Sequence, residues 1–380
     1  MPLIEWILGS LLVFYCLVLV ALYLGFRRLC RQLPASPSTL SKDELPSVSV
    51  IVAARNEEKN LPALIACLQA QDYPQEKLEI IIVDDRSDDN TWTILTEAER
   101  QHDNIKALRI TERLADYAPK KRALDMGIRA SKGAILLLTD ADCLPSPAWA
   151  HTVAGYYSPD VHVVAGYSPY VYSMATSRLV RGMLSLDCFA FAAVAAASTG
   201  WGQPLTPTGT NLSYRRDVYF SSGGFEPIKQ WISGDDDLFM RYVAGKNLGR
   251  FSYALDPAAY VPTFAPISWR QFWHQRIRFG SKSKHHNLPI ILGAVAVFLL
   301  NAGISLGVVL AMSVGTPAWT PVLIVWGPKA LAEFIFLASI ASRFNESALL
   351  TFFLPTAILH PFYITVFGFL GLFAKFRWKD

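Results

Sequence analysis

Two long uncharged stretches, one at each end of the chain, constrain its fold more than any other feature. Residues 6–26 carry no charged side chain, and neither do residues 288–328. About 20 apolar residues suffice to cross a bilayer as a helix, so both ends predict membrane helices. Nearly all of the 35 lysines and arginines and the 31 aspartates and glutamates lie between them, within residues 27–287. The sequence therefore predicts a water-exposed domain with a membrane segment on either side.

The first apolar stretch is interpreted as an anchor and not as a cleaved signal peptide. A signal peptide carries its basic residues before the apolar run, whereas Arg27, Arg28 and Arg31 follow it here. Basic residues flank a membrane helix on its cytoplasmic side. We therefore expect a transmembrane anchor over residues 1–30, in an inner or plasma membrane, with the next domain in the cytoplasm.

The second apolar stretch predicts a C-terminal membrane domain over residues 288–374. We expect about three helices in it, near residues 289–312, 320–341 and 349–373. Lys329 and Glu333 lie four residues apart on one helix face, where pairing would lower the cost of burying them. His360-Pro361 predicts a kink in the last helix.

The number of crossings leaves one question open at the C-terminus. One helix before and three helices after a cytoplasmic domain put the C-terminus outside. The tail over residues 375–379 is basic, however, and favours the inside. One apolar segment could therefore be re-entrant, and the sequence does not decide this.

A further apolar stretch, residues 179–198, lies inside the charged middle of the chain. It could be another membrane span, or a helix lying in the membrane interface. Arg178, Arg181 and Ser185 recur at helical spacing, and Asp187 interrupts the apolar run. A span would also put its two flanks on opposite sides of the membrane, although both flanks carry motifs that belong to one site. We therefore favour an interfacial helix over about 178–198.

The middle of the chain predicts an α/β domain. Short apolar runs at 48–54, 79–83 and 134–139 predict buried strands. Helical patterns follow the first strand, from residue 60 to 70, and the second, where Asp88 or Asp89 is the expected cap. Such alternation indicates a parallel sheet, in which ligands bind beyond the carboxyl ends of the strands.

Acidic residues stand at those strand ends. Asp84 ends the second predicted strand, and Asp140 and Asp142 flank a single residue at the end of the third. Each aspartate alone is as readily a turn former or helix cap. Two carboxylates this close repel each other unless a cation lies between them, and hard oxygen ligands suit Mg²⁺ or Mn²⁺.

Charge and cysteine usage exclude other classes of protein. The net charge is only +4 and no long run of lysine or arginine occurs, so no nucleic-acid partner is expected. The five cysteines show no CxxC spacing. They therefore predict neither a zinc site nor a disulfide framework.

Taken in order, these motifs resemble those of family 2 glycosyltransferases of the GT-A fold, in their membrane-bound branch. That branch contains ceramide glucosyltransferases and several polysaccharide synthases. The resemblance covers residues 46–285 and implies a mixed, mainly parallel sheet flanked by helices, with transmembrane helices in addition. It also implies a nucleotide-sugar donor, a lipid or saccharide acceptor, membrane lipids as surroundings, and Mg²⁺ or Mn²⁺ as cofactor.

The resemblance assigns donor-binding roles to several of these residues. The turn from Ala53 to Glu57 would hold the nucleotide, and Asp84 would accept a hydrogen bond from its base, usually uracil. Lys120 would contact the diphosphate, in a segment where Pro119 replaces the family's Gly and Asp125 its Asn. Its alternative is a solvated basic face. Asp140 would face ribose and metal, and Asp142 the metal.

The resemblance also assigns the catalytic base and the acceptor side. Gly209, Thr210 and Asn211 match an acceptor-side segment. In the run Asp235-Asp236-Asp237, the spacing to Leu238 selects Asp235 as base, with Gly234 where the family has Glu. Asp236 is the alternative base, and a capped helix start is compatible with both.

The last motif, Gln275-Arg276-Ile277-Arg278-Phe279, resembles the family's QxxRW sequence with Phe for Trp. Gln275 and Arg278 would bind the donor, with Arg278 on the leaving diphosphate, and Phe279 would support the acceptor. An amphipathic interfacial helix is the alternative interpretation.

These assignments predict an inverting sugar transfer, in which an Asp base deprotonates the acceptor hydroxyl. A processive polysaccharide synthase is the alternative. The last motif favours it, whereas the small number of membrane helices disfavours it. A transporter with a nucleotide-binding domain is a remote alternative, because Lys329, Glu333 and His360 are too few to form an ion path.

Overall fold

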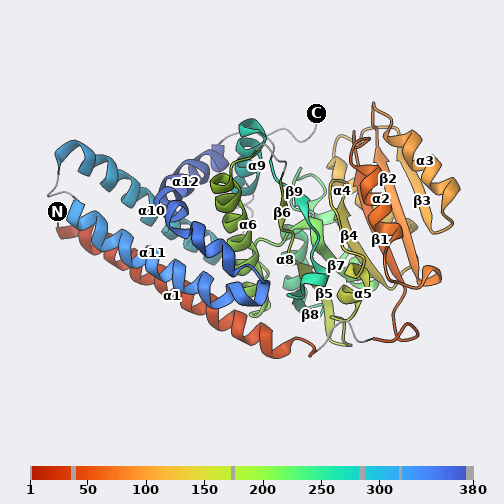
Figure 1. Cartoon of the computed structure of the whole chain (residues 1–380), viewed down its shortest axis with the longest axis horizontal. Helices are drawn as coiled ribbons and strands as arrows, with labels where there is room; N and C mark the ends of the chain where they lie inside the picture. Colours follow the sequence, from red (N-terminus) through yellow and green to blue (C-terminus); the bar gives the residue numbers. More distant parts are fainter. Residues whose placement is uncertain are drawn as a thin grey trace.

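The computed structural model describes residues 2–35, 40–172, 176–266, 268–281, 287–315 and 319–373. The basic tail over residues 375–379 lies outside these ranges, as does most of the Pro/Ser stretch after residue 35. Figure 1 shows a sheet domain at one end of the molecule and long helices at the other.

A seven-stranded sheet forms the centre of the middle domain, in the order β3-β2-β1-β4-β7-β5-β8. Its strands are β1 (Val48–Ala54), β2 (Leu78–Asp85), β3 (Ile105–Ile110), β4 (Ile135–Asp140), β5 (Val161–Gly166), β7 (Leu212–Arg215) and β8 (Arg250–Ala254). The first four strands run parallel, and β7 enters antiparallel between β4 and β5. This mixed, mainly parallel sheet confirms the predicted fold class.

Helices cover both faces of the sheet, which explains why its central strands read as continuous apolar runs. The helices are α2 (Leu61–Gln69), α3 (Thr91–Gln101), α4 (Pro119–Ala130), α5 (Trp149–Ala154), α6 (Arg178–Thr199), α7 (Arg216–Ser222) and α8 (Asp237–Gly245). Helices α2, α3 and α5 share one apolar core with alternate strand residues such as Val50 and Ile82. Helices α4 and α6 share the other core with Ile51 and Val83.

The start of α3 differs from the expectation. Asn90 is the N-cap residue, and the helix begins at Thr91. Asp89 nevertheless accepts a hydrogen bond from the Thr91 backbone N–H, 3.0 Å away. The aspartate therefore binds the first turn from one position before the cap.

A second, two-stranded parallel sheet and one more helix lead from this domain to the membrane helices. The strands are β6 (Tyr170–Val171) and β9 (Thr263–Phe264), and the helix is α9 (Trp269–Ser281). The long helices beyond are α1 (Pro2–Gln32), α10 (Leu288–Val314), α11 (Trp319–Ala341) and α12 (Phe353–Phe373).

Five helices of the described ranges are long and apolar enough to cross a membrane, namely α1, α6, α10, α11 and the segment that ends in α12. Helices α1, α10 and α11 extend away from the sheet, whereas α6 lies between the sheet and the other long helices (Figure 1). This position agrees with the interfacial helix expected over residues 178–198, which stays a prediction.

Helices α1 and α6 touch through their backbones at two glycines. A Cβ atom on Gly25 would lie 2.3 Å from the Ala197 carbonyl oxygen, and one on Gly200 would lie 1.9 Å from the Gly25 oxygen. Real Cβ atoms do not approach other atoms this closely, so only glycine fits at the crossing. This contact attaches the N-terminal helix to the sheet domain.

Helix α12 changes direction along its length (Figure 1) and contains Pro361, the residue at which the sequence predicts a kink. Proline lacks the N–H that would bind the Ala357 carbonyl in a regular helix. The Trp326 indole N–H of α11 donates to that carbonyl instead, at 3.3 Å. Tertiary contact therefore stabilises the bend.

The two ends of α12 both lie against parts of the chain next to the sheet domain. The short helix before it, Ser347–Phe352, packs on α6, where the Phe352 ring meets Gly182. Near its other end, Gly371 lies against Gly280 of α9, so closely that a Cβ on Gly371 would be 2.6 Å from the Gly280 carbonyl carbon.

We predict that Gly25→Val separates α1 from α6. Overpacking a closed contact costs about 1–3 kcal/mol, so the variant should unfold at a lower temperature in detergent than the parent. Gly9→Val is the matched control, since no atom lies within 4 Å of a Cβ built on Gly9 of the same helix. Equal unfolding temperatures for the two variants would contradict the crossing.

Candidate functional site

The carboxyl edge of the parallel strands gathers the predicted donor residues. Strand register pairs Ala53 with Asp140 on one side of β1 and Ala54 with Asp84 on the other. The turns after β1, β2 and β4 therefore open at one edge, which is where α/β sheets bind ligands.

Lys120 joins two of the predicted acids at this edge. Its Nζ lies 2.8 Å from Asp140 Oδ1 and 2.9 Å from Asp235 Oδ2. The lysine is the second residue of α4, whereas Asp235 comes from the loop before α8, so the ion pairs connect three separate elements. The sequence assigned these residues to donor and base, and the fold brings them into contact.

The environment of Lys120 keeps it charged. Burial alone would lower the pKa of the lysine, but the negative charges of Asp140 and Asp235 outweigh burial and raise its pKa above the usual value. The side chains of Lys120 and Asp235 are only 15% and 11% exposed. Lys120 is therefore a cation throughout the pH range in which proteins are assayed.

Gly209 lies directly against this cluster. A Cβ on Gly209 would be 3.1 Å from Asp235 Oδ2 and 3.5 Å from Lys120 Nζ. Its backbone N–H donates to Asp236 Oδ2 at 3.3 Å. The predicted acceptor-side segment thus adjoins the predicted base, and a side chain at residue 209 would narrow the space beside it.

The three consecutive aspartates have different surroundings. Asp236 is the N-cap of α8 and accepts from the Asp237 backbone N–H at 2.7 Å. Asp237 is buried and accepts from the Leu238 N–H at 2.8 Å. Asp235 instead faces Lys120. The capped helix start and a separate role for Asp235 therefore coexist.

Gly234, which stands where the family has glutamate, adopts a backbone conformation that suits glycine. Its φ is +97°, and a Cβ there would lie 2.3 Å from Leu238 Cδ1. A glutamate would need a different loop. The departure from the family motif is thus linked to the local turn that presents Asp235.

Sequence reasoning missed Lys121, the residue after Lys120. Its side chain is fully buried, and its Nζ donates to the carbonyls of Trp231 and Ser233 at 2.5 and 2.7 Å. Consecutive lysines therefore act in different ways, since Lys120 contacts the acids and Lys121 holds the loop that carries Asp235. The signal in the sequence was a pair of lysines at the start of an amphipathic helix. Which side chain contacts the acids and which contacts the loop depends on tertiary structure.

The donor set at the end of β4 fits a divalent cation shared with a substrate. Among the described residues, no group of three or more His, Cys, Asp or Glu side chains could enclose a metal. Asp140 and Asp142 provide two hard oxygen ligands, and the Lys120 ammonium already occupies a cation position beside Asp140. Mg²⁺ commonly binds through one or two carboxylates together with substrate phosphates, which matches this arrangement.

The turn after β1 is held to the loop after β2 by backbone hydrogen bonds. The N–H groups of Asn56, Glu57 and Glu58 donate to Ser87, Thr91 and Asp89 side chains at 2.8–3.1 Å. Asn56 has a φ of +53°, as a tight turn requires. Glu57 is buried under the turn, where Asn60 donates to its carboxylate at 2.7 Å.

Asp84 is fully buried and contacts the protein itself. It accepts from the Ser87 backbone N–H at 3.1 Å, and Arg109 Nε lies 3.1 Å from its other oxygen. In this conformation the carboxylate organises the loop and has no surface for a base. Its predicted contact with the nucleotide stays a prediction and requires Arg109 to move.

The acceptor-side residues divide into two kinds. Thr210 donates to the Ser168 hydroxyl at 2.7 Å. Asn211 is buried, donates to the carbonyls of Tyr167 and Ala259, and accepts from the Trp149 indole at 3.1 Å. Asn211 therefore fixes the fold around the segment, while Gly209 is the member that lies against the cluster.

The QxxRW-like motif lies on α9. Gln275 accepts from the Tyr170 hydroxyl at 3.4 Å, and the Phe279 ring packs on Phe191 of α6. Arg278 lies 5.7 Å from the Phe279 ring centroid. The role of Arg278 on the leaving diphosphate, which the resemblance assigns, stays a prediction.

Arg276, which the sequence reading passed over, is the buried member of this motif. Its Nη2 lies 2.7 Å from Asp187 Oδ2 of α6, and it is surrounded by aromatic rings from α6, α9 and α12. A buried ion pair of this kind joins α9 to α6 beneath the sheet domain. The signal in the sequence was Asp187, a charged residue within an apolar helix, because such a residue needs a partner of opposite charge.

A mainly parallel sheet with acids and a lysine at its carboxyl edge defines the class of GT-A nucleotide-sugar transferase folds. Residues 49–226 match the family model described as Glycosyl transferase family 2. The region over residues 49–226 therefore belongs to the family 2 glycosyltransferases, which confirms the predicted family, while the roles of the individual motif residues stay predictions.

One solved structure is similar over nearly the whole chain, and curated relatives are similar over about two thirds of it. The mannosyltransferase PcManGT of Pyrobaculum calidifontis, solved with GDP-Man and Mn²⁺, has the same fold at a TM-score of 0.57 and 20% identity, covering 94% of this chain and 98% of that one. The beta-monoglucosyldiacylglycerol synthase of Trichormus variabilis is 37% identical over 62% of this chain and 48% of its own length. The probable glycosyltransferase YdaM of Bacillus subtilis is 28% identical over 64% and 56%. The chain thus spans about half the length of these curated relatives.

We predict that Lys121→Met destabilises the loop before Asp235. Two part-buried carbonyls lose their donor, which costs roughly 1–3 kcal/mol, while the apolar stem of the side chain remains. Thermal unfolding should shift down, and sugar-transfer turnover should fall more than the affinity for the nucleotide. Lys132→Met, at an exposed position, is the control. Unchanged stability and turnover in Lys121→Met would contradict the positioning role.

Proposed function

We propose that the chain is a membrane-bound glycosyltransferase that moves a sugar from a nucleotide-diphosphate donor, a UDP-sugar, to a hydroxyl group of a membrane lipid with inversion at the anomeric carbon. The observation that carries the proposal is the contact of Lys120 with both Asp140 and Asp235 at the carboxyl edge of the sheet. Membership of family 2 and the apolar helices beside the site support it.

The donor diphosphate is the partner for which Lys120 is placed. Its charge competes with the two carboxylates for the ammonium and draws Lys120 toward the leaving group. Withdrawal of the cation leaves the Asp235 carboxylate oxygen accessible to the acceptor hydroxyl. Donor binding and activation of the base are thus coupled through one side chain.

Asp235 is the proposed general base. It accepts the proton of the acceptor hydroxyl while the hydroxyl oxygen attacks the anomeric carbon and the bond to the diphosphate breaks. General-base catalysis commonly contributes about 10²–10⁴-fold to a rate. Asp236 is the poorer candidate, because backbone N–H groups of Gly209 and Asp237 already donate to its two oxygens. A single displacement inverts the anomeric centre and needs no carboxylate nucleophile.

Asp140 and Asp142 are the residues proposed to hold Mg²⁺ or Mn²⁺ against the donor diphosphate. When bound, the ion supplies charge neutralisation for the leaving group. The mannosyltransferase of the same fold was solved with Mn²⁺, which supports a divalent ion here.

A lipid acceptor is favoured over a saccharide. The Trichormus relative is named for a product built on diacylglycerol. In this chain, α6 packs both on the sheet and on the membrane helices, and α9 is attached to α6 by an ion pair. This arrangement supports an acceptor at the membrane surface. The acceptor side of the site faces Gly209 and Thr210.

We further infer that the sheet domain is cytoplasmic and that α12 enters and leaves the membrane on the same side. Helices α1, α10 and α11 would then cross it. The bend at Pro361 and the contacts of both ends of α12, with α6 and with Gly280, support this. Three crossings put the basic tail over residues 375–379 on the side of Arg27, Arg28 and Arg31, which agrees with the positive-inside rule.

The function is tested by incubating the purified chain in lipid vesicles with nucleotide sugars and Mg²⁺ or Mn²⁺, and measuring nucleotide diphosphate and glycolipid. Asp235→Asn keeps the shape of the side chain but cannot accept the proton, so turnover should fall by roughly 10²-fold or more with donor binding retained. Asp236→Asn should do less and Asp237→Asn least. If Asp236→Asn alone is inactive, the base is one residue further on. Full activity in all three variants would contradict an aspartate base in this run.

Reporter fusions test the topology in a bacterial inner membrane. A fluorescent protein after Asp380 should fold and fluoresce, because it stays in the cytoplasm. Alkaline phosphatase inserted after Gly315, between α10 and α11, should be active, because it is exported. Active phosphatase fused after Asp380 would show that α12 crosses the membrane.

A further inference from the structure

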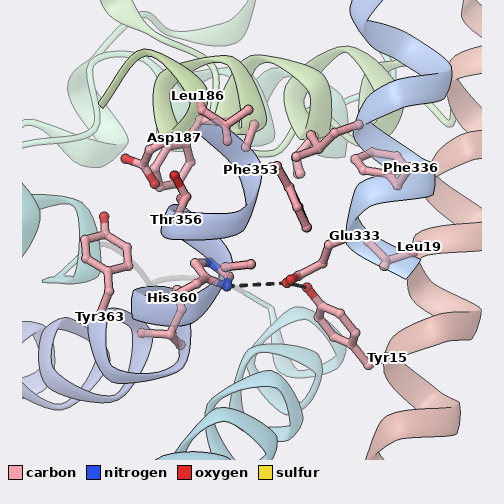
Figure 2. A pocket seen from close by; sticks show the side chains of 16 residues that line it. Tyr15, Leu19, Leu186, Asp187, Glu333, Phe336, Phe353, Thr356, His360 and Tyr363 are labelled. Atoms are coloured by element: carbon pink, nitrogen blue, oxygen red, sulfur yellow. Dashed lines mark hydrogen bonds and ion pairs between the residues drawn. The ribbon is translucent and has the colours of Figure 1, made fainter. Parts of the chain in front are cut away.

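A cavity of about 190 Å³ lies among α1, α6, α11 and α12, on the membrane side of α6 (Figure 2). Its walls are mostly apolar and include Leu19, Leu186, Phe336 and Phe353. An apolar cavity of about 150 Å³ already accepts a ligand of the size of benzene. This one therefore has room for a segment of a hydrocarbon chain.

Polar groups from three helices meet at one end of the cavity. Tyr15 of α1 donates to Glu333 Oε1 of α11 at 2.6 Å, and Lys329 Nζ donates to the same oxygen at 2.7 Å. His360 Nδ1, beside the bend of α12, lies 3.4 Å from this oxygen. Figure 2 shows Tyr15, Glu333 and His360 pointing toward one another. The expected pairing of Lys329 with Glu333 is thus confirmed, and side chains of α1 and α12 contact the same carboxylate.

The charged groups around the cavity are already neutralised within the protein. Glu333 is paired with Lys329, and Asp187, which lines the other end, is paired with Arg276. Among the described residues that line the cavity, no lysine or arginine appears, while two carboxylates do. His360, the other titratable residue of the lining, lies against the paired Glu333. The lining therefore offers its two carboxylates as neutralised pairs and is otherwise apolar, which favours an apolar occupant.

The wall that α6 contributes connects to the candidate active site. Asp187 lines the cavity, and the Sγ of the adjacent Cys188 donates to the Ser168 carbonyl at 3.4 Å. The Ser168 hydroxyl accepts from Thr210, the neighbour of Gly209, which contacts Asp235 and Asp236. Helix α6 thus lies between the cavity and the base.

We propose that this cavity binds one hydrocarbon chain of the acceptor, a hydroxyl-bearing lipid of the diacylglycerol type. The inference rests on the proposed function in taking the acceptor to be a membrane lipid. The chain segment lies against the apolar walls, with the hydroxyl end of the lipid directed round α6 toward Asp235. The apolar walls and the volume support the binding of a chain, and the type of lipid is that of the proposed function.

Ala357→Phe fills the cavity from α12, because Ala357 lines it and is 4% exposed. Ile358→Phe is the matched control, since this neighbouring residue is 46% exposed.

The probe is a diacylglycerol carrying a photoreactive diazirine in one acyl chain, in phosphatidylcholine vesicles. In the parent and in Ile358→Phe, cross-links should map to peptides from α6 and α12 that line the cavity. In Ala357→Phe they should fall about tenfold, with a matching rise in KM for diacylglycerol, the scale of steric change in an apolar pocket.

Donor binding and release of nucleotide diphosphate without lipid should be unchanged in Ala357→Phe, which separates a lost acceptor site from a damaged enzyme. If Ala357→Phe does not fold, Ala190→Phe fills the same cavity from α6. Equal cross-linking of cavity peptides in parent and filled variants would overturn the site. Equally strong labelling of the cavity by a diazirine-bearing polyprenyl phosphate would overturn the diacylglycerol type of acceptor. Failure of every nucleotide sugar to react would instead count against the proposed function, since cross-linking needs no donor.

Discussion

The candidate site depends on one cation shared by two carboxylates. Lys120 reaches Asp140 at the end of β4 and Asp235 in the loop before α8, so it fixes the distance between the edge of the sheet and that loop. Neither partner can be removed without leaving charge unbalanced in a largely buried place. Lys121 and Gly234 hold the same loop by a buried ammonium and a left-handed turn. The geometry of the acids is therefore set by neighbours that carry no chemistry of their own.

Helix α6 transmits this geometry to the membrane half of the molecule. One side of it packs on the sheet, and the glycine crossing at Gly25 and Gly200 attaches α1 to its end. Asp187 binds Arg276 of α9, so the helix that carries the QxxRW-like motif is attached to the same element. Because these contacts are backbone crossings and a buried ion pair, the sheet domain and the membrane helices hold a fixed relation at this joint.

Local signals in the sequence identified the strands at 48–54 and near 79–83 and 134–139, the acids at their ends, the kink at Pro361 and the Lys329–Glu333 pair. Each of these depends on residues close together in the chain. The antiparallel entry of β7 could not be predicted, because it depends on pairing between segments some 75 residues apart. The same reason hid the direction of Lys121, the burial of Asp84 against Arg109, and the arrival of Tyr15 and His360 at Glu333.

The two lysine-centred clusters of the molecule differ in one respect that bears on what each can bind. Lys120 lies at the open edge of the sheet between two carboxylates, and a donor diphosphate can replace either partner because its own charge compensates the ammonium. Lys329 is fully buried in apolar helices, where replacing Glu333 would require an anion to leave water and enter hydrocarbon. The same pairing rule therefore allows an anionic ligand at the sheet and opposes one in the membrane. The proposed anionic donor at the sheet and the proposed hydrocarbon chain in the membrane cavity fit this division of charge, with α6 as the boundary between them.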